Sequence, residues 1–193
     1  YILKALNELR QLTSCPESKN EDIISSKRIV LINNVIDAVA NGHKVLIFTN
    51  YIKSIENICE DLEKQGIKYL SMTGSTKDRQ SLVDKFQNDP KYKVFVMTLK
   101  TGGVGLNLTS ADTIFIYDPW WNKTVENQAI DRAYRIGQNK TVLSYKLILK
   151  DSIEEKILKL QEIKNELLEN LISEDNSSVK FLTEKDIQFI LSE

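Results

Sequence analysis

The sequence is poor in the residues that build metal centres and disulfide-bonded folds. Its 193 residues include two cysteines, Cys15 and Cys59, and a single histidine, His43. The two cysteines lie far apart and form no Cys-x-x-Cys pair, and with one histidine they cannot supply the four ligands of a structural zinc site. Cysteine usage of this kind is typical of a protein that keeps free thiols in a reducing cytosol.

Long apolar runs are also absent. The longest runs of aliphatic or aromatic residues have four members, as in Val45–Phe48, whereas a helix needs about 20 apolar residues to cross a bilayer. The sequence therefore predicts no membrane span. No signal peptide and no initiator methionine precede Tyr1, which predicts a fragment of a longer protein. With 41% hydrophobic residues, the composition favours one folded domain with a substantial core.

The phosphate-binding loop of P-loop nucleotide hydrolases is missing as well. That loop requires a Gly-x-x-x-x-Gly-Lys-Ser/Thr pattern, which occurs nowhere in the sequence. No Asp-Glu pair suited to binding Mg²⁺ follows a predicted strand. We therefore do not expect this chain alone to hold a nucleoside triphosphate in the manner of a P-loop enzyme.

Charge is distributed unevenly along the chain, although the formal net charge is only −1. Residues 1–150 carry 21 Lys or Arg and 16 Asp or Glu, whereas residues 151–193 carry 5 and 11. A local excess of positive charge favours binding to a polyanion, so the first part is the candidate binding part. The alternative, which the composition leaves open, is that these charges only cover solvated faces.

Apolar runs alternate with segments of helical periodicity through most of the chain. The expected strands cover 44–49, 69–72, 93–98, 113–118 and 141–149, and the expected helices cover 1–12, 26–40, 54–64, 77–86, 125–136, 152–172 and 183–191. Strands that alternate with helices in this way form right-handed βαβ units around a parallel sheet. The sequence therefore predicts a three-layer α/β domain, followed by an amphipathic helix that packs against it.

Glycine is scarce, but three of the seven glycines lie within four positions, at Gly102, Gly103 and Gly105. They follow the strand expected at 93–98, and ligands of open parallel sheets bind at the carboxyl ends of strands. Glycines at such a place let the backbone come close to a phosphate and direct its amides toward it. Because glycine-rich turns after strands are often only tight turns, a purely structural role stays open.

A group of polar residues recurs with helical spacing further along the chain. On the helix expected at 125–136, Gln128, Arg132 and Arg135 would lie on one face, because residues three and four apart are neighbours. Two guanidinium groups held side by side suit a polyphosphate, to which they can make bidentate contacts. The alternative is a pair of surface arginines that form ion pairs with acids such as Asp131.

Three segments together resemble motifs V and VI of the Swi/Snf-type ATPases, which are DNA translocases of helicase superfamily two. They are Gly102–Leu108, Asp118–Asn122 and Arg132–Gln138, and their combination is far more specific than a lone glycine motif. The similarity extends to Lys44–Asn50 (motif IV), to Gly74 with Arg79 and Phe86 (motif IVa), to Leu9–Gln11 with Pro16, and to Ser152–Ile157, which resembles the start of the family's brace helix. The departures are Tyr134 in place of His, Lys123 in place of Pro, and Thr13–Cys15 where Asn-His often precedes the proline.

The resemblance implies a RecA-like second motor lobe, the helicase C-terminal domain, over residues 26–150. Residues 1–25 would lead in from a missing first lobe, and residues 151–193 would form the brace helix and a helical tail. In the family, the first lobe carries the Walker A motif and the DExx box and holds ATP with Mg²⁺ in the cleft between the lobes. Arg132 and Arg135 would then reach the β- and γ-phosphates as arginine fingers.

The resemblance also implies further nucleotide contacts and a site for DNA. Gln128, Gly103, Gly105 and Asn107 would lie at the nucleotide, with Asn107 near the ribose. Duplex DNA would lie along the loops at the carboxyl ends of strands, which contact the sugar-phosphate backbone without reading its sequence. The predicted DNA contacts are Thr49, Asn50, Tyr51, Gly74, Ser75, Lys100, Thr101, Gly102 and Trp121. Trp121 would stack on a base or sugar, whereas Trp120 is expected to pack in the core.

The expected function is that of the second lobe of an ATP-dependent double-stranded DNA translocase or nucleoprotein remodeller, inactive without its first lobe. Its expected partners are duplex DNA and the first lobe of the same polypeptide, with a protein substrate on the DNA as an open question. It would act in the cytoplasm, on the bacterial nucleoid, or in the nucleus of a eukaryote. Two alternatives stay open: the second lobe of another superfamily two helicase, and a protein-binding module that uses the helix from Ser152.

Overall fold

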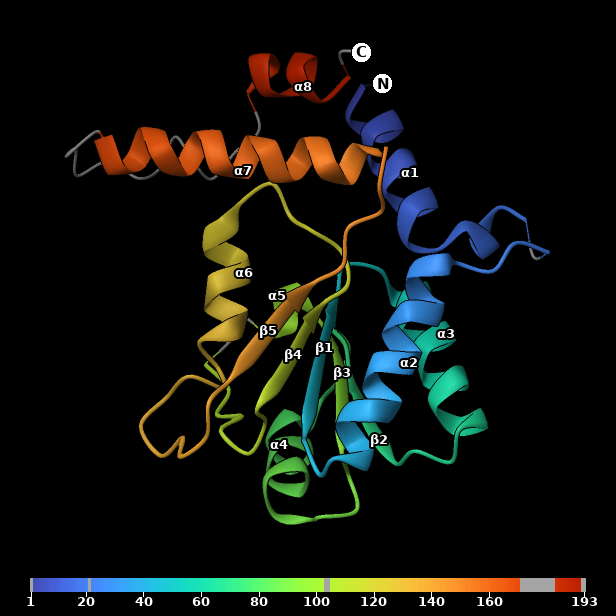
Figure 1. The fold of residues 1–193 in the computed structure, drawn as a ribbon, viewed down its shortest axis with the longest axis vertical. Helices are drawn as coiled ribbons and strands as arrows, with labels where there is room; N and C mark the ends of the chain where they lie inside the picture. The colour runs from blue at the N-terminus through green and yellow to red at the C-terminus, as the bar shows by residue number, and fades with distance from the viewer. Residues whose placement is uncertain (1, 21, 103–104, 171–182, 192–193) are drawn as a thin grey trace.

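The computed structural model describes residues 2–20, 22–102, 105–170 and 183–191 (Figure 1). Five strands form one all-parallel sheet in the order β2-β3-β1-β4-β5. Their bounds are Val45–Thr49 (β1), Tyr69–Met72 (β2), Val94–Thr98 (β3), Thr113–Ile116 (β4) and Leu143–Lys146 (β5). The predicted α/β domain with a central parallel sheet is confirmed.

Helices cover both faces of this sheet and extend beyond it. Their bounds are Ile2–Ser14 (α1), Ser26–Ala40 (α2), Ile52–Lys64 (α3), Arg79–Asn88 (α4), Leu99–Gly102 (α5), Lys123–Ile130 (α6), Ile153–Asn170 (α7) and Glu184–Leu191 (α8), with a 3₁₀ turn at Pro16–Ser18 (η1). Helices α2 and α3 cover one face of the sheet, and α4, α5 and α6 cover the other (Figure 1). The short helix α5 was not expected from the sequence.

The central strands are apolar on both sides because both faces of the sheet are covered. Val45 and Ile47 of β1 pack on the side of α2 and α3, whereas Leu46 and Phe48 pack on the side of α4 and α6. Successive side chains of a strand point to opposite faces, so one strand contributes to two separate cores. The edge strand β5 differs, because its side chains are mostly exposed.

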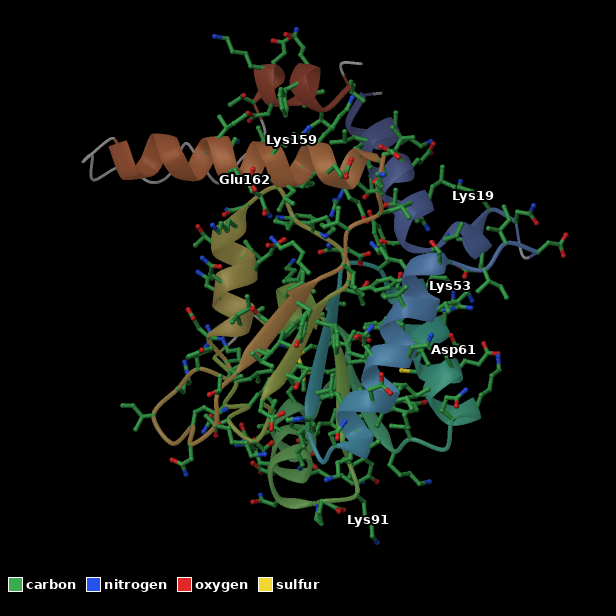
Figure 2. All side chains as sticks on the ribbon, viewed as in Figure 1. Lys19, Lys53, Asp61, Lys91, Lys159 and Glu162 are labelled. Carbon is green, nitrogen blue, oxygen red and sulfur yellow. The ribbon has the colours of Figure 1, made fainter. Side chains whose placement is uncertain are left out.

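A third apolar cluster lies outside the sheet, between α1, α7 and α8. Its buried members are Leu6 of α1, Ile157 and Leu160 of α7, and Ile190 of α8. Figure 1 shows α7 crossing the molecule above the carboxyl ends of the strands, with α1 and α8 beside it. Lys91, which precedes β3, lies at the end of the sheet away from α7 (Figure 2). The helix expected from residue 152 therefore packs against the domain, at the end where the candidate DNA-contacting loops begin.

Candidate functional site

Helix α6 is shorter than its sequence predicts, and this changes the candidate phosphate-binding face. Asn122 precedes the helix, and its side-chain oxygen accepts a hydrogen bond from Thr124 N at 2.9 Å. Such a cap stabilises the first turn, whose amides have no partners within the helix. The helix ends at Ile130, and residues 131–137 form turns and bends.

The backbone carbonyls that would continue α6 are hydrogen-bonded to other groups. The carbonyl of Arg132 accepts a hydrogen bond from Leu108 N at 3.0 Å, and that of Ala133 accepts one from Gln138 Nε2 at 3.2 Å. A helix would direct both carbonyls to backbone amides four residues later. The predicted helix over 125–136, with its continuous polar face, is therefore wrong beyond Ile130.

The same contacts join the arginine segment, defined here as residues 131–138, to the loop that follows the glycine cluster. The side-chain amide of Gln138 donates to the carbonyls of Thr109 and Ala111 at 3.0 and 2.8 Å. With the bond from Leu108 N, these contacts hold the loop against the arginine segment. The structure thus brings together, through one backbone hydrogen bond and the side chain of Gln138, the two segments that the family resemblance assigns to the nucleotide.

The two arginines of this segment are presented differently. Arg135 is exposed, whereas Arg132 is half-buried and its Nε donates to the carbonyl of Gln128 at 3.0 Å. Gln128 itself is exposed near the end of α6. Because guanidinium groups stay protonated at physiological pH, the segment carries permanent positive charge. Charge of this kind at a surface suits the oxygen atoms of a polyphosphate.

The other predicted nucleotide residues lie in the loop before the arginine segment. Gly105 and Asn107 are exposed, and Gly105 has a φ of +46°, in the left-handed region that favours glycine. Among the described residues, no heavy atom lies within 4 Å of the place where Gly105 would carry a Cβ. The backbone is therefore accessible at this point. Gly102 ends α5, and Gly103 lies outside the described residues.

A buried carboxylate, that of Asp118, organises the carboxyl ends of β1 and β4. It accepts hydrogen bonds from Asn50 N at 2.8 Å and from the hydroxyls of Ser14 and Thr49. Asn50 is half-buried and donates its side-chain amide to the Asp118 carbonyl at 3.2 Å. Thr49 is completely buried, which corrects the prediction that it contacts DNA. Its hydroxyl holds the end of the strand instead.

A buried ion pair extends this arrangement to α2 and α7. The Nζ of Lys27 lies 2.5 Å from Glu154 Oε1 and 3.7 Å from Asp118 Oδ1, and all three side chains are at most 4% exposed. Glu154 also accepts hydrogen bonds from Thr13 Oγ1 at 2.9 Å and from Leu149 N at 2.8 Å. These donors stabilise a second carboxylate beside a single ammonium group. We name Ser14, Lys27, Thr49, Asp118 and Glu154 the strand-end cluster.

The sequence contains a signal for these buried charges, although it does not show what they do. Lys27 lies four residues before the buried Leu31, and Glu154 lies three residues before the buried Ile157. Each charged residue therefore falls on the apolar face of its own helix. A charge at such a position indicates a buried partner, because lone charges are almost never fully buried.

The two tryptophans after β4 form a stack that α1 covers. Their ring centroids lie 3.9 Å apart, and the guanidinium carbon of Arg10 lies 4.6 Å from the centroid of Trp120 and 5.0 Å from that of Trp121. Trp121 also packs against the cluster between α1, α7 and α8. Both rings are half-buried. Their surroundings give them a packing role, and the stacking of Trp121 on a base or sugar stays a prediction.

Tyr51, the other aromatic residue among the predicted DNA contacts, is half-buried beside α1. Its hydroxyl donates to Asn7 Oδ1 at 3.3 Å, and the Arg10 guanidinium carbon lies 6.0 Å from its ring centroid. Burial raises the pKa of Tyr51 to about 12, so the phenol stays protonated and remains a hydrogen-bond donor at neutral pH.

The remaining predicted DNA contacts lie on the turn after β2 and on α5, at the same end of the sheet. Gly74–Ser75 is exposed, and Arg79 holds this turn by donating from Nη2 to the Gly74 carbonyl at 3.0 Å. Lys100 is exposed on α5. Thr101 is buried, and its hydroxyl is hydrogen-bonded to that of Thr98 at 2.6 Å. This burial corrects the prediction that the Thr101 side chain contacts DNA.

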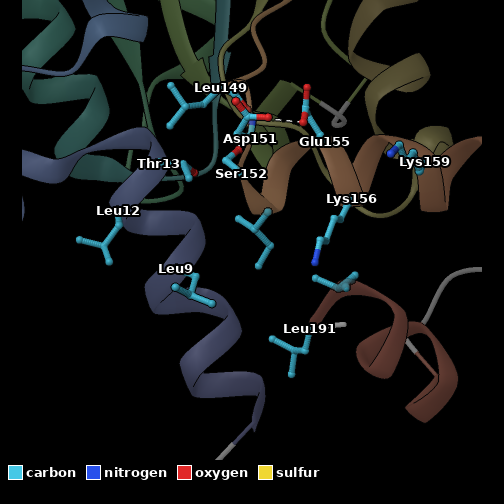
Figure 3. A pocket seen from close by; sticks show the side chains of 12 residues that line it. Leu9, Leu12, Thr13, Leu149, Asp151, Ser152, Glu155, Lys156, Lys159 and Leu191 are labelled. Carbon is cyan, nitrogen blue, oxygen red and sulfur yellow. Dashed lines mark hydrogen bonds between the residues drawn. The ribbon is translucent and has the colours of Figure 1, made fainter. Parts of the chain in front are cut away.

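A groove of about 740 Å³ lies between α1, α7 and α8 (Figure 3). Leu9, Leu12 and Leu191 line it together with Lys156 and Lys159. None of the predicted nucleotide or DNA residues lines this groove. It is therefore separate from the candidate site.

The described part of the chain lacks two kinds of feature. No group of three or more His, Cys, Asp or Glu side chains is arranged to hold a metal ion. No helix combines the length and apolar character that a membrane crossing requires.

Comparison with known proteins identifies the family. Residues 26–137 match the model of the helicase conserved C-terminal domain, so the chain belongs to that family. It is 38% identical over 190 residues to a Mycoplasma pneumoniae protein described as an uncharacterized ATP-dependent helicase, an alignment that covers 96% of this chain. The chain spans only 18% of the length of that relative.

Two solved structures give the subclass within this family. The C-terminal part of the Fun30 ATPase domain has a TM-score of 0.73 and 32% identity, over 95% of this chain and 60% of that one. The SWI2/SNF2 ATPase core domain of Sulfolobus solfataricus has a TM-score of 0.74 and 30% identity, over 98% of this chain and 40% of that one. The resemblance to the second lobe of Swi/Snf-type ATPases is thus confirmed.

Proposed function

We propose that this chain is the second motor lobe of an ATP-dependent double-stranded DNA translocase of the Swi/Snf type. The observation that supports this most strongly is the position of the arginine segment. It contains Arg132 and Arg135 and is hydrogen-bonded to the loop that follows the glycine cluster, on a fold similar to that of the SWI2/SNF2 ATPase core. Arginines at a domain surface can complete a nucleotide site whose other half belongs to a partner domain. In this proposal residues 1–25 lead in from that partner, a first lobe of the same polypeptide.

The residues present fit one side of a nucleotide site. The arginines supply permanent positive charge, Gly105 offers accessible backbone, and the side-chain amides of Asn107 and Gln128 are exposed. The described residues offer no acidic cluster for Mg²⁺, so we assign the ion and the phosphate-binding loop to the first lobe. ATP bound there would supply the phosphoanhydride bond whose hydrolysis drives the motor.

Arg135 would act on charge that develops during hydrolysis. Its exposed guanidinium group would stabilise negative charge on the oxygens of the β- and γ-phosphates as the phosphoanhydride bond between these two phosphates breaks. Arg132 would act in the same way, oriented by its hydrogen bond to the Gln128 carbonyl. Both arginines are already charged and need gain no proton at the moment of reaction.

Duplex DNA would lie along the carboxyl ends of the strands. The accessible candidates there are Asn50, Tyr51, Gly74, Ser75, Lys100 and Trp121. Gly102, at the end of α5, remains a further candidate. Amide, hydroxyl and ammonium groups of this kind contact phosphates and sugars rather than base edges, so binding would not depend on sequence. Opening and closing of the cleft between the lobes would then shift one lobe along the DNA relative to the other. A protein bound to DNA, on a bacterial nucleoid or in a nucleus, would be displaced or remodelled by this movement.

Substitution of the arginines in the intact two-lobe protein tests the proposal. Arg135→Ala should lower DNA-stimulated kcat by about 10³-fold and leave ATP and duplex DNA binding nearly unchanged, and Arg132→Ala should behave similarly. Lys123→Ala, which removes an exposed cation at the start of α6, is the matched control and should hydrolyse ATP at the parental rate. If both arginine variants hydrolysed ATP at the parental rate, the arginine segment would have no role in hydrolysis.

A strand-separation assay distinguishes the proposed translocase from the other helicases of the superfamily. The intact protein should hydrolyse ATP faster when duplex DNA is added but should release no single strand from it. Release of a strand would favour the helicase alternative.

A further inference from the structure

The start of α6 carries a buried charge that the proposed function does not use. Glu126 is 1% exposed. Its Oε2 lies 2.5 Å from Nζ of Lys146 on β5. Its Oε1 accepts hydrogen bonds from Trp120 N at 2.7 Å and from Gln161 Nε2 at 3.0 Å. We name these four residues, Trp120, Glu126, Lys146 and Gln161, the α6–α7 joint.

Gln161 connects the other three residues of the joint from α7. Its Nε2 donates to the carboxylate of Glu126 and to the carbonyl of Trp120, and its Oε1 accepts a hydrogen bond from Lys146 Nζ at 2.9 Å. The side chain is almost completely buried, on the same helix as the buried apolar Ile157. An amide has a donor and an acceptor in one group, so it can bond an anion and a cation at once.

Helix α6 connects this joint to the arginine segment over a short distance. Glu126 precedes Arg132 by six residues, and α6 ends between them at Ile130. At the helical rise per residue, Glu126 and the last residue of α6 are separated by about 6 Å along the helix axis. At its other end the arginine segment is fixed by Gln138, whose amide bonds the loop after the glycine cluster. The arginine segment is therefore held at one end by the loop that follows the glycine cluster and at the other end, through α6, by α7.

We infer that the α6–α7 joint positions the arginine segment, so that docking of α7 on the domain sets the arrangement of Arg132 and Arg135. Removing α7 would take from Glu126 one of its three partners and leave the pair with Lys146 open to water, which weakens the hold on α6. The joint residues are positioning residues, since the proposed function places none of them at the nucleotide. For that role of the arginines, the inference rests on the proposed function.

This arrangement makes α7 a point of control over hydrolysis. Any partner that draws α7 away from the domain would release the start of α6 and slow the motor without touching the nucleotide or the DNA. Conversely, a contact that holds α7 in place would keep the arginines in their working arrangement.

Amide hydrogen exchange in the intact protein tests the positioning without any nucleotide. The amides of residues 131–133 donate to carbonyls of α6, so their exchange is slow while the end of that helix is held. Gln161→Ala should speed exchange in 131–138 by about tenfold, the effect of losing one buried hydrogen-bonded group. Glu162→Ala, at the exposed neighbouring position on α7 (Figure 2), should leave it at the parental rate. Equal exchange of this segment in the two variants would overturn the inference.

Steady-state kinetics of the same variants give an independent result. Gln161→Ala should lower kcat about 10- to 100-fold, as misplacement of a catalytic group does, with KM for ATP and the affinity for duplex DNA unchanged. A kcat equal to that of Glu162→Ala, or a change confined to KM, would refute the positioning role. If instead the parental protein shows no DNA-stimulated hydrolysis, the proposed function fails, and the exchange experiment still decides whether the joint holds the segment.

Discussion

The strand-end cluster and the arginine segment are both rich in charge, but they present it in opposite ways. In the strand-end cluster, Lys27, Asp118 and Glu154 are buried, and Lys27 forms an ion pair with each of the two carboxylates. In the arginine segment, Arg135 is exposed, and among the described residues no ion pair involves it. The first set of charges therefore holds helices and strand ends together, whereas the second remains accessible to a ligand.

The largest effect on stability should follow from breaking the buried pair. Lys27→Met leaves Glu154 and Asp118 buried without their ammonium partner, and we expect a loss of about 3–5 kcal/mol in the free energy of unfolding. Arg135→Ala should change the same quantity by less than about 0.5 kcal/mol, because an exposed side chain is removed. Urea denaturation of both variants measures the contrast. Similar losses of unfolding free energy in the two variants would contradict the distinction between a structural strand-end cluster and an accessible arginine segment.

Asp112 is an intermediate case, a buried carboxylate whose partners are exposed. Burial alone would raise its pKa, but the hydrogen bonds from Lys140 Nζ at 2.8 Å and from His43 Nδ1 at 3.1 Å outweigh burial and hold the pKa of Asp112 below its usual range. Because the pKa of Asp112 is lower in the folded protein, its carboxylate contributes its full stabilisation above the unfolded pKa of about 3.9. This stabilisation is lost as the pH falls through the pKa that Asp112 has in the folded protein.

Asp112→Asn should therefore destabilise the protein at pH 7, by about 1.5 kcal/mol, the typical value of a hydrogen bond to a charged group. The difference from the parental protein should shrink as the pH is lowered below about 4. Thermal unfolding measured from pH 3 to pH 7 follows both quantities. A difference that grows toward low pH would show that the sign of the pKa shift is wrong.

The smallest effect concerns one lysine at the end of a strand. In the intact protein, Lys100→Ala should weaken binding of duplex DNA of every sequence alike and lower the slope of log K against log salt by about one. Lys91, exposed at the opposite end of β3 (Figure 2), offers a matched control, and Lys91→Ala should leave the slope unchanged. A slope insensitive to Lys100→Ala would move the DNA site away from α5.

The elements whose signals are local could be predicted from the sequence. The helix expected at 26–40 is found as α2 with the same bounds, because its apolar face and its N-cap, Ser25, lie within the helix and next to it. The expected helix at 125–136 fails for the opposite reason. Its apolar spacing continues past Ile130, but Leu108 and the side chain of Gln138 take the carbonyls that would continue it.

The organisation of the site was less predictable than the fold because its contacts join distant parts of the chain. Lys27 and Glu154 are separated by 127 positions and Ser14 and Asp118 by 104, so no local pattern pairs them. A polar residue at the end of a strand can face solvent or face a partner from a distant part of the chain. Thr49 was expected to face solvent and contact DNA, but it is buried and its hydroxyl donates to the carboxylate of Asp118, which follows β4.

In the proposed motor, Arg132 and Arg135 act on a nucleotide that another lobe holds. Calorimetric titration of ATP with Mg²⁺ into this 193-residue chain tests this division of the site between two lobes. We predict no binding in the micromolar range and no hydrolysis, because the chain has neither a phosphate-binding loop nor, in its described part, an acidic cluster for the ion. A micromolar Kd for ATP would contradict the two-lobe account.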